Sequence, residues 1–537
     1  SVEKAVGTTI YVNGKKSGNG DDNNSGTSKD QPVKTLKHAV DLAGENGTVI
    51  ILNTVEITED TVLDNNVTIK RGGTCDVGMI YINDHTLTIN HATIDGNKEE
   101  YPNSSQMISI YGYPKININE GAKLCNNGDS VIQQMGSNRR NAPVVTINGG
   151  EICDNDSTGN YYSAAIIMFQ EVGELHINGG SIHDNKGGAI DVGVPIFNMT
   201  GGKIYNNDNS GESFGGIWLV TFVTNGVISG GEIYGNKSNN GGGISISAPT
   251  QLTVSGNTSI HDNIVTGDGS AIYADGRSSI VIEDGVQITG NKGIGDNSGG
   301  AIALSDSAST TIGQATISNN SAQYGGGIAA YSSETVTLNG TIIKNNTALS
   351  TGNWGNGGGI SINKTGTLNI NDAVIEGNHA HHGGGLIAYD TAVVNINGNT
   401  SIKNNQAPAD GGGGIVSGGS ATVNLNSATI SGNKALYGSG IGIWNNGKVV
   451  MKKDVSIIQN IVTSTNSNSA GGAIYVEGNS NGGSQFIMED GLIKDNTTTG
   501  GVHCAGIFVN GFKDQALVKI KGGTIINNVN ENGDDQS

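Results

Sequence analysis

The chain of 537 residues is poor in cations, cysteine and aromatic side chains, and it has no long apolar run. Its 29 Lys and Arg residues form no basic stripe, so we predict no nucleic-acid partner. The four Cys residues follow neither a metal-binding spacing nor the pattern of a small disulfide-linked domain. Since no stretch of about 18 apolar residues occurs, we also predict no membrane-spanning segment.

Acidic side chains dominate the charge. The 48 Asp and Glu residues give a net charge of −19. Enzymes for anionic polysaccharides gather Arg and Lys in their grooves, and such clusters are absent, so a neutral glycan fits the charge better. The acidity also serves simply to keep a secreted protein in solution. The chain begins SVEKAVGTTIYVNG without a signal peptide, and we expect a secreted or cell-surface bacterial protein whose signal peptide precedes these residues.

Glycine is abundant, at 86 residues, and 35% of the chain is hydrophobic in regularly spaced segments, which argues against disorder. One phrase recurs: a small residue, an aliphatic residue, two variable residues and an anchor Asn. The anchors span residues 97–528 with an average spacing of about 29 residues, which is typical of a solenoid. They are Asn97, Asn127, Asn155, Asn185, Asn207, Asn236, Asn263, Asn291, Asn320, Asn346, Asn378, Asn405, Asn433, Asn460, Asn496 and Asn528.

Each repeat contains three short segments that alternate with period two, such as GGGISIS, QLTVSG and TSIHDN after Asn236. The LxxLxL phrase of leucine-rich repeats is absent, and propeller blades would need longer units with four strands. We therefore predict an all-β fold, a single-stranded right-handed parallel β-helix over residues 76–537, preceded by a cap over residues 1–75. Its coils stack at about 4.8 Å, and the anchor Asn side chains bond from coil to coil.

The first 75 residues depart from the repeat. The segment DQPVKTLKHAVDLAGENG predicts a helix that caps the first coil, with Val33, Leu36, Ala39 and Val40 along one face. In the polar loop before it, Asp21 and Asp22 belong either to a solvated turn or to a Ca²⁺ site. We expect no required cofactor.

Residues two positions before an anchor should form an outward-facing column. Cys125 and Cys153 occupy this slot on neighbouring coils, where a disulfide is within reach but not required. The same slot holds His183, Tyr205, Tyr234 and His261 further along the chain. Such a column is either a contact surface or simply a row of tolerated residues.

Residues that break the repeat on its outer face are the candidates for function. The outward positions around the GG-[AG]-I phrase hold Ser, Ala, Gly or Asn on most coils, but aromatic and acidic residues on others. Aromatic faces stack on sugar rings, and two carboxyls can cleave a glycosidic bond when one is protonated and the other ionised. We predict Asp268 and Asp275 as the catalytic pair. The predicted substrate-binding residues are Trp218, Tyr273, Asp306, Tyr324, Tyr331, His382 and Tyr389.

The proposed pair has rivals. Seven residues of straight strand span roughly 23 Å, so Asp268 and Asp275 meet only if the chain turns at Gly267, Gly269 and Ser270. Asp306 lies one coil further on and nearly level with Asp275. Asp184 and Asp191 have the same seven-residue spacing.

Other chemistries have weaker support. No GxSxG elbow precedes a helix, which disfavours Ser/His/Asp catalysis. His379, His381 and His382 form either a zinc site or a polar corner. A lyase needs a catalytic Lys or Arg and an acidic Ca²⁺ cluster; Arg277 is the only Arg near the predicted pair, and no such acidic cluster is visible.

The opening GTSKDQPVKTLKHAV and the repeated GGGI and IxxN phrases resemble those of secreted pectin-lyase-like β-helix proteins over essentially the whole chain. Within that group the chain most resembles glycoside hydrolase family 136, the lacto-N-biosidases of gut bacteria, which release lacto-N-biose from human milk oligosaccharides with retention. The family's catalytic pair is two Asp residues seven apart. The resemblance implies that Asp268 is the acid/base and Asp275 the nucleophile, and that a helical companion domain or chaperone is a partner.

Three functions follow from the sequence. The first is a retaining glycoside hydrolase that acts on a neutral host or milk oligosaccharide and releases lacto-N-biose. The second is a non-catalytic β-helix that binds glycans or acts as an adhesin. The third is a polysaccharide lyase or a pectin-type hydrolase.

Overall fold

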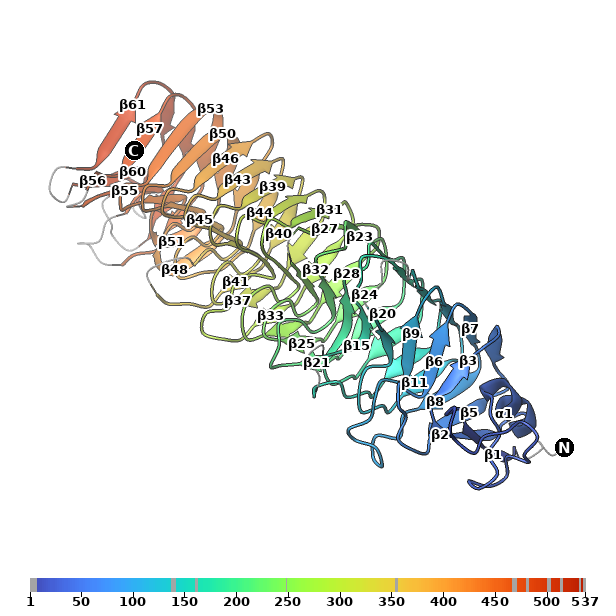
Figure 1. The fold of residues 1–537 in the computed structure, drawn as a ribbon. Coiled ribbons are helices and arrows are strands. Elements are labelled where there is room, and N and C mark those ends of the chain that lie inside the picture. The colour runs from blue at the N-terminus through green and yellow to red at the C-terminus, as the bar shows by residue number, and fades with distance from the viewer. Residues whose placement is uncertain are drawn as a thin grey trace, which may run out of the picture. The chain divides into compact units, whose positions relative to one another are not determined.

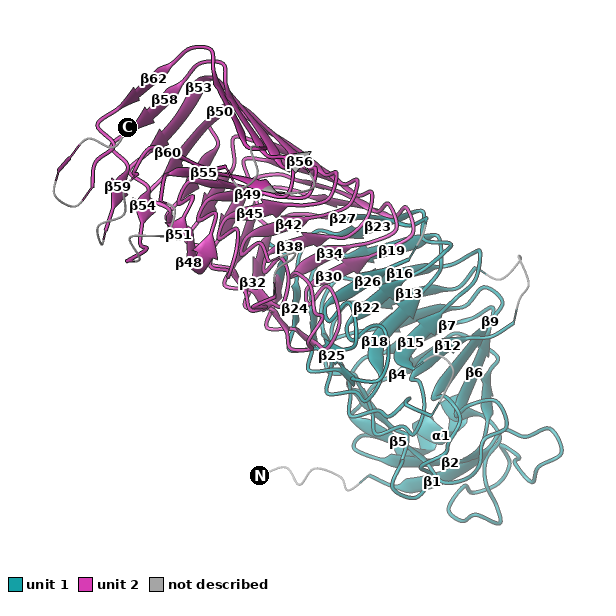
Figure 2. Cartoon of the chain, turned by 90° about the vertical axis from the view of Figure 1, so that its left-hand side faces the viewer, with its two compact units in different colours: residues 1–253, 257–259 teal, residues 254–256, 260–537 magenta. Residues whose placement is uncertain are grey.

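The structure, a computed structural model, describes residues 7–136, 142–159, 163–247, 249–352, 356–465, 471–479, 482–499, 504–511, 515–530 and 533–534. These residues divide into two compact units (Figure 2). Unit 1 comprises residues 1–253 and 257–259, and unit 2 comprises residues 254–256 and 260–537. The predicted boundary at residue 75 falls inside unit 1.

Each unit is a right-handed parallel β-solenoid, which confirms the predicted all-β fold (Figure 1). A coil of unit 1 runs through three strands, and each strand pairs in parallel with the corresponding strand of the next coil. The strands of one coil are β15 (Ala164–Met168), β16 (Glu174–Ile177) and β17 (Ser181–His183). Their partners are β18 (Gly188–Val192), β19 (Ile196–Met199) and β20 (Lys203–Tyr205).

Unit 2 repeats this pattern. One of its coils contains β30 (Ile272–Ala274), β31 (Ser279–Ile282) and β32 (Gln287–Thr289). They pair with β34 (Ile302–Leu304), β35 (Ser309–Ile312) and β36 (Thr316–Ser318). The three strands per coil match the prediction. Short fourth strands, which the sequence did not indicate, pair between coils at one corner, such as β21 (Asp208–Asn209) with β25 (Lys237–Ser238) in unit 1.

Helix α1 (Leu36–Ala43) is shorter than predicted. It begins after Thr35, whose hydroxyl accepts a hydrogen bond from the His38 N–H. Val33 lies before the helix because it forms a parallel bridge with Val12. The buried face of α1 packs on β1 (Thr9–Asn13) and β2 (Thr48–Asn53). This face consists of Leu36, Ala39, Val40 and Ala43. This packing agrees with a role in covering the first coil.

Asp22 fastens the loop that precedes α1. Its carboxylate accepts hydrogen bonds from the backbone N–H groups of Lys34 and Thr35, at 2.7 and 2.9 Å, and from the Thr35 hydroxyl at 2.9 Å. Burial opposes ionisation, but these donors hold the pKa of Asp22 below its usual value. The contacts agree with a structural turn at this carboxylate.

The anchor Asn residues form a buried ladder in each unit, as predicted. In unit 1 the side-chain N–H donates to the next anchor's oxygen from Asn155 to Asn185 at 2.9 Å and from Asn185 to Asn207 at 2.8 Å. In unit 2 the same bond runs from Asn378 to Asn405 at 2.9 Å and from Asn405 to Asn433 at 3.0 Å. From Asn127 on, the residue before each anchor turns the corner with positive φ, and it is usually Asn, Asp or Gly. These Asn residues are therefore structural.

The outward-facing column is also confirmed in unit 1. Cys125 lies in register with Cys153, and both are free thiols, so no disulfide joins them. His183 stacks on Tyr205 with 4.6 Å between ring centroids, and Tyr205 stacks on Tyr234 at 4.8 Å. These spacings match the separation of neighbouring coils.

No helix in the described part of the chain has the length and apolar character needed to span a membrane.

Candidate functional site

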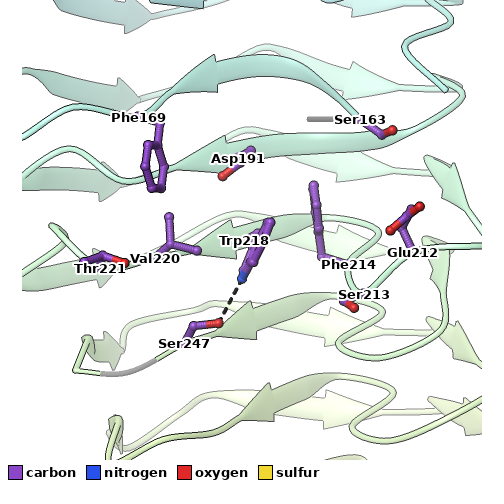
Figure 3. A pocket seen from close by; sticks show the side chains of 10 residues that line it. All are labelled: Ser163, Phe169, Asp191, Glu212, Ser213, Phe214, Trp218, Val220, Thr221 and Ser247. Carbon is purple, nitrogen blue, oxygen red and sulfur yellow. Dashed lines mark hydrogen bonds between the residues drawn. The ribbon is translucent and has the colours of Figure 1, made fainter. Parts of the chain in front are cut away.

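A pocket of about 600 Å³ opens on the outer face of unit 1 (Figure 3). It lies over β18, β22 (Ile217–Leu219) and β26 (Ile244–Ile246), which pair in register. The lining residues are Ser163, Phe169, Asp191, Glu212, Ser213, Phe214, Trp218, Val220, Thr221 and Ser247. They combine aromatic rings with two carboxyl groups.

Asp191 owes its position to the alternation of β18. Ile190 and Val192 point into the core, so the side chain between them points outward. Its register partners on the adjacent strands are Ile167 and Trp218. Because these large side chains lie on either side of it, the Asp191 side chain is buried although it is on the outer face.

The carboxyl of Asp191 is in an unusual environment. Both of its oxygens are buried and have no hydrogen-bond partner among the described residues. Burial without a compensating donor or cation disfavours the charged form and raises the pKa of Asp191 to about 7. Asp191 therefore retains its proton over much of the pH range in which other aspartates are ionised.

Aromatic rings form one wall of the pocket. Trp218 packs on Phe214, with ring centroids 5.1 Å apart, and its indole N–H donates to the Ser247 hydroxyl at 3.1 Å. Phe214 in turn packs on Ala164 and Ile167. Figure 3 shows these rings beside Asp191. The hydrogen bond orients the indole, and such rings can stack on the apolar face of a sugar.

Glu212 brings a second carboxyl to this pocket. It is exposed, in the loop that precedes Phe214. Glu212 and Ser163 also line a neighbouring cavity of about 380 Å³, whose other lining residues include Lys186 and Asp208. The aromatic pocket thus continues into a polar one, an arrangement that can hold both an apolar ring face and hydroxyl groups.

The predicted residues Asp268 and Asp275 lie in unit 2, on either side of β30. The Asp268 carboxylate accepts hydrogen bonds from the Tyr331 hydroxyl at 3.0 Å and from the Gly299 N–H at 2.9 Å. Burial raises the pKa of Asp268, and these two donors oppose the rise. Asp275 is half-buried where the chain leaves β30 and turns, and its backbone carbonyl accepts from the Ser278 N–H at 3.1 Å.

Tyr273 lies between these two aspartates in sequence, on the outer face of β30. Burial raises the pKa of Tyr273, and the charges of Asp275, Asp268 and Asp306 raise it further. Its hydroxyl lies 3.1 Å from the Ser305 hydroxyl. The structure therefore brings one tyrosine within electrostatic reach of all three predicted carboxylates.

The other predicted residues of unit 2 lie in different surroundings. Tyr331 belongs with Asp268, and its surroundings include Tyr273 and Tyr324. Asp306 is exposed in a turn with φ of 51°. His382 and Tyr389 lie near Trp444 instead.

His382 contacts residues that are distant in the sequence. Its Nδ1 is 2.9 Å from a carboxylate oxygen of Asp410, and its Nε2 is 3.1 Å from Nδ1 of His381. The ring centroid of Trp444 is 6.2 Å from that of His382. His379, the third member of the conceivable zinc site, is exposed and lies outside this cluster of the described residues.

Tyr389 accepts a hydrogen bond from the Asn445 side chain at 3.3 Å. Its ring and the Trp444 indole approach each other across Gly418, where a Cβ atom would come within 2.6 Å of the tyrosine ring. The close approach explains the glycine at this position.

The rival pair Asp184 and Asp191 does not share the pocket. Asp184 is exposed in a turn with φ of 53°, and its carboxylate pairs with His183 at 2.7 Å. Sequence reasoning named Asp191 only through its spacing to Asp184, and it missed Phe169, Glu212 and Phe214 altogether. The available signal was the position of Asp191 directly after Ile190, an outward slot that holds small residues on most coils.

Comparison with known proteins supports the fold. A family model described as a right handed beta helix region matches residues 251–400 and 296–462. No curated protein and no solved structure matches the chain. The sequence match and the observed strand pairing together place this chain among proteins with a pectate-lyase-like right-handed β-helix fold.

Proposed function

We propose that this protein is a secreted glycoside hydrolase that acts on a neutral glycan in the pocket of unit 1. The observation that carries the proposal is a buried carboxyl, that of Asp191, which has no hydrogen-bond partner among the described residues and shares one pocket with the indole of Trp218. A β-helix fold is compatible with proteins that act on or bind glycans.

The residues have distinct roles in this proposal. A sugar ring stacks on Trp218 and Phe214. Asp191 acts as the general acid: its proton moves to the glycosidic oxygen as the bond from that oxygen to the anomeric carbon breaks. The exposed carboxylate of Glu212 either attacks the anomeric carbon or takes a proton from the attacking water.

Entry of the substrate must open the site further. The oxygens of Asp191 are shielded by their neighbours, so a sugar reaches them only if the ring of Trp218 or Phe214 moves. Trp218 is the more exposed of the two rings. We therefore assign Trp218 as the ring that yields to the substrate.

The finer assignment of substrate comes from the resemblance to lacto-N-biosidases, and we propose lacto-N-tetraose as the first substrate to test. That resemblance also provides a second candidate site. In this second site Asp268 is the acid/base and Asp275 the nucleophile. The half-buried state of Asp268 and its contact with Tyr331 support this assignment. We propose that Tyr273 contacts the sugar at that site.

The test is incubation with lacto-N-tetraose and a panel of other neutral oligosaccharides, followed by product analysis. The variants are Asp191→Asn, Glu212→Gln, Asp268→Asn and Asp275→Asn, with Asp184→Asn, in the turn before β18, as the matched control. Loss of at least about 100-fold in kcat for Asp191→Asn, with Asp184→Asn unchanged, is the expected result. Loss confined to Asp268→Asn and Asp275→Asn moves the catalytic site to unit 2.

The alternative of a glycan-binding protein without catalysis rests on the shielded state of the Asp191 oxygens. Calorimetric binding of an oligosaccharide that is not turned over, lost in Trp218→Ala, establishes this alternative and rejects the hydrolase. A lyase, in contrast, would release an unsaturated product that ultraviolet absorbance detects.

A further inference from the structure

A cluster of nitrogen and oxygen ligands lies at a corner of unit 2 that the proposed function does not use. His381 and His382 precede β45 (Leu386–Ala388), and Asp410 lies one coil further on, in β48 (Gln406–Gly411). One ligand atom from each residue lies within 4.8 Å of the others. Since Asp410 follows its histidines by more than 25 residues, only the stacking of coils brings the three together.

Two buried polar atoms of this cluster have no hydrogen-bond partner among the described residues. The His382 side chain is 7% exposed, and its Nδ1 makes no hydrogen bond to the described residues, although Asp410 Oδ2 is 2.9 Å away. The distance is that of a hydrogen bond, but the two groups are not aligned as donor and acceptor. Asp410 Oδ1 is likewise buried without a hydrogen-bond partner among the described residues. Unsatisfied groups of this kind require an explanation.

The spacing of the imidazole nitrogens fits a metal ion. Nδ1 of His381 and Nε2 of His382 are 3.1 Å apart. If each lay about 2.0–2.1 Å from a common zinc ion, they would subtend an angle of about 100° at the metal. That angle lies between the values of octahedral and tetrahedral coordination.

The local electrostatics also favour a bound cation. The carboxylate of Asp410 lies 2.9 Å from Nδ1 of His382 and brings negative charge to the two imidazoles. The carboxyl of Glu477 is within electrostatic reach of Asp410. Asp410 and Glu477 thus bring two carboxyl groups to this corner of unit 2.

We propose that His381, His382 and Asp410 bind one divalent transition metal ion of the zinc class. The two imidazoles are direct ligands, and the carboxylate of Asp410 either completes the set or orients His382 through Nδ1. Three protein groups leave a coordination position for water or for an oxygen of a ligand. The ring of Trp444 lies 6.2 Å from that of His382, and the ring of Tyr437 lies 6.4 Å from that of Trp444, so these rings can hold the apolar part of such a ligand.

The experiment is calorimetric titration of the full chain with ZnCl₂, and with NiCl₂ while Trp fluorescence is followed, since Trp444 lies beside the site. The variants are His381→Ala and Asp410→Asn. A second group with ligand spacing, Glu151, Cys153 and His183, supplies the control variant Cys153→Ser. Trp444→Phe identifies the source of the fluorescence change.

We expect one zinc ion to be bound in wild type and in Cys153→Ser, with binding lost in His381→Ala. Asp410→Asn should weaken it about 10–100-fold. Because His381 is partly exposed, His381→Ala should keep its melting temperature without metal, which separates lost binding from lost folding. Dissociation constants above about 0.1 mM in wild type would overturn the proposal. So would unchanged stoichiometry and affinity in His381→Ala, or binding lost instead in Cys153→Ser.

Discussion

The side chain of Asp191 in unit 1 is buried and that of Asp268 in unit 2 is half-buried, yet the hydrogen-bond donors around them differ. Asp268 accepts hydrogen bonds from Tyr331 and Gly299. The described residues supply no such donor to Asp191, which lies between Ile167 and Trp218. Burial opposes the charge of both, but only Asp268 has donors that restore part of the lost solvation. The same type of coil therefore gives one carboxyl a raised pKa without a donor among the described residues, and gives the other two hydrogen-bond donors.

The largest expected effect is on how stability depends on pH. The pKa of Asp191 is raised from 3.8 to about 7. Between these values the unfolded chain has lost a proton that the folded chain keeps, so the free energy of unfolding falls as pH rises through this window. The contribution over about three pH units is about 4 kcal/mol. Urea denaturation near pH 4 and near pH 8 should show this fall in wild type relative to Asp191→Asn.

Asp184→Asn is the control for that prediction, since Asp184 is exposed in the turn that precedes the strand of Asp191. Its stability should follow that of wild type at both pH values. If wild type and Asp191→Asn change in parallel with pH, Asp191 is ionised in the folded state and the contrast with Asp268 disappears.

A second prediction tests whether the Asn ladder stabilises the two units equally. Asn185 and Asn405 each donate to the next anchor and to a backbone carbonyl, and each accepts from the preceding anchor. Replacing either by Ala leaves several buried groups without partners. We expect a loss of about 3 kcal/mol in the free energy of unfolding for both Asn185→Ala and Asn405→Ala.

The comparison uses urea denaturation of the two variants beside Asn103→Ala. Asn103 is exposed, so its replacement should change stability by no more than about 0.5 kcal/mol. A clearly unequal loss between Asn185→Ala and Asn405→Ala would show that the two ladders do not contribute alike.

The smallest predicted effect concerns Asp268. Tyr331→Phe removes a donor that lowers the pKa of Asp268, so that pKa should rise further. The loss in stability should be about 1–2 kcal/mol at neutral pH, the cost of one buried hydrogen bond. Carbon-detected NMR titration of the Asp carboxyls measures the pKa, and Tyr324→Phe is the matched control. An Asp268 pKa that does not move would show that Tyr331 is not its donor in solution.

Most of the fold could be predicted from the sequence because each coil repeats the same short sequence pattern. The anchor Asn residues, the period-two strands and the buried face of α1 all follow from patterns within about 30 residues. The start of α1 was misplaced because Val33 is held by a contact with Val12, and the sequence pattern carries no sign of that bridge. The short fourth strands were missed because two residues are too few to show a period.

The sites were less predictable, because their residues come from different coils. Trp218 was identified as an outward aromatic residue, but its contact with Phe214 depends on how the loop before β22 packs. His382 was identified too, whereas Asp410 was not, because it lies in the QAPADG segment outside the repeated phrase. The assignment of Asp268 and Asp275 as a catalytic pair stays a prediction.

The sequence by itself determined the coil, its length, its core and its Asn ladder, because these depend on residue types at fixed intervals along one chain. Only the tertiary structure decided which outward side chains are covered and which have donors. Those properties depend on the register partners one coil away, about 4.8 Å across the sheet but more than 20 residues away in sequence. The raised pKa of Asp191 and the contact of His382 with Asp410 are both consequences of that stacking.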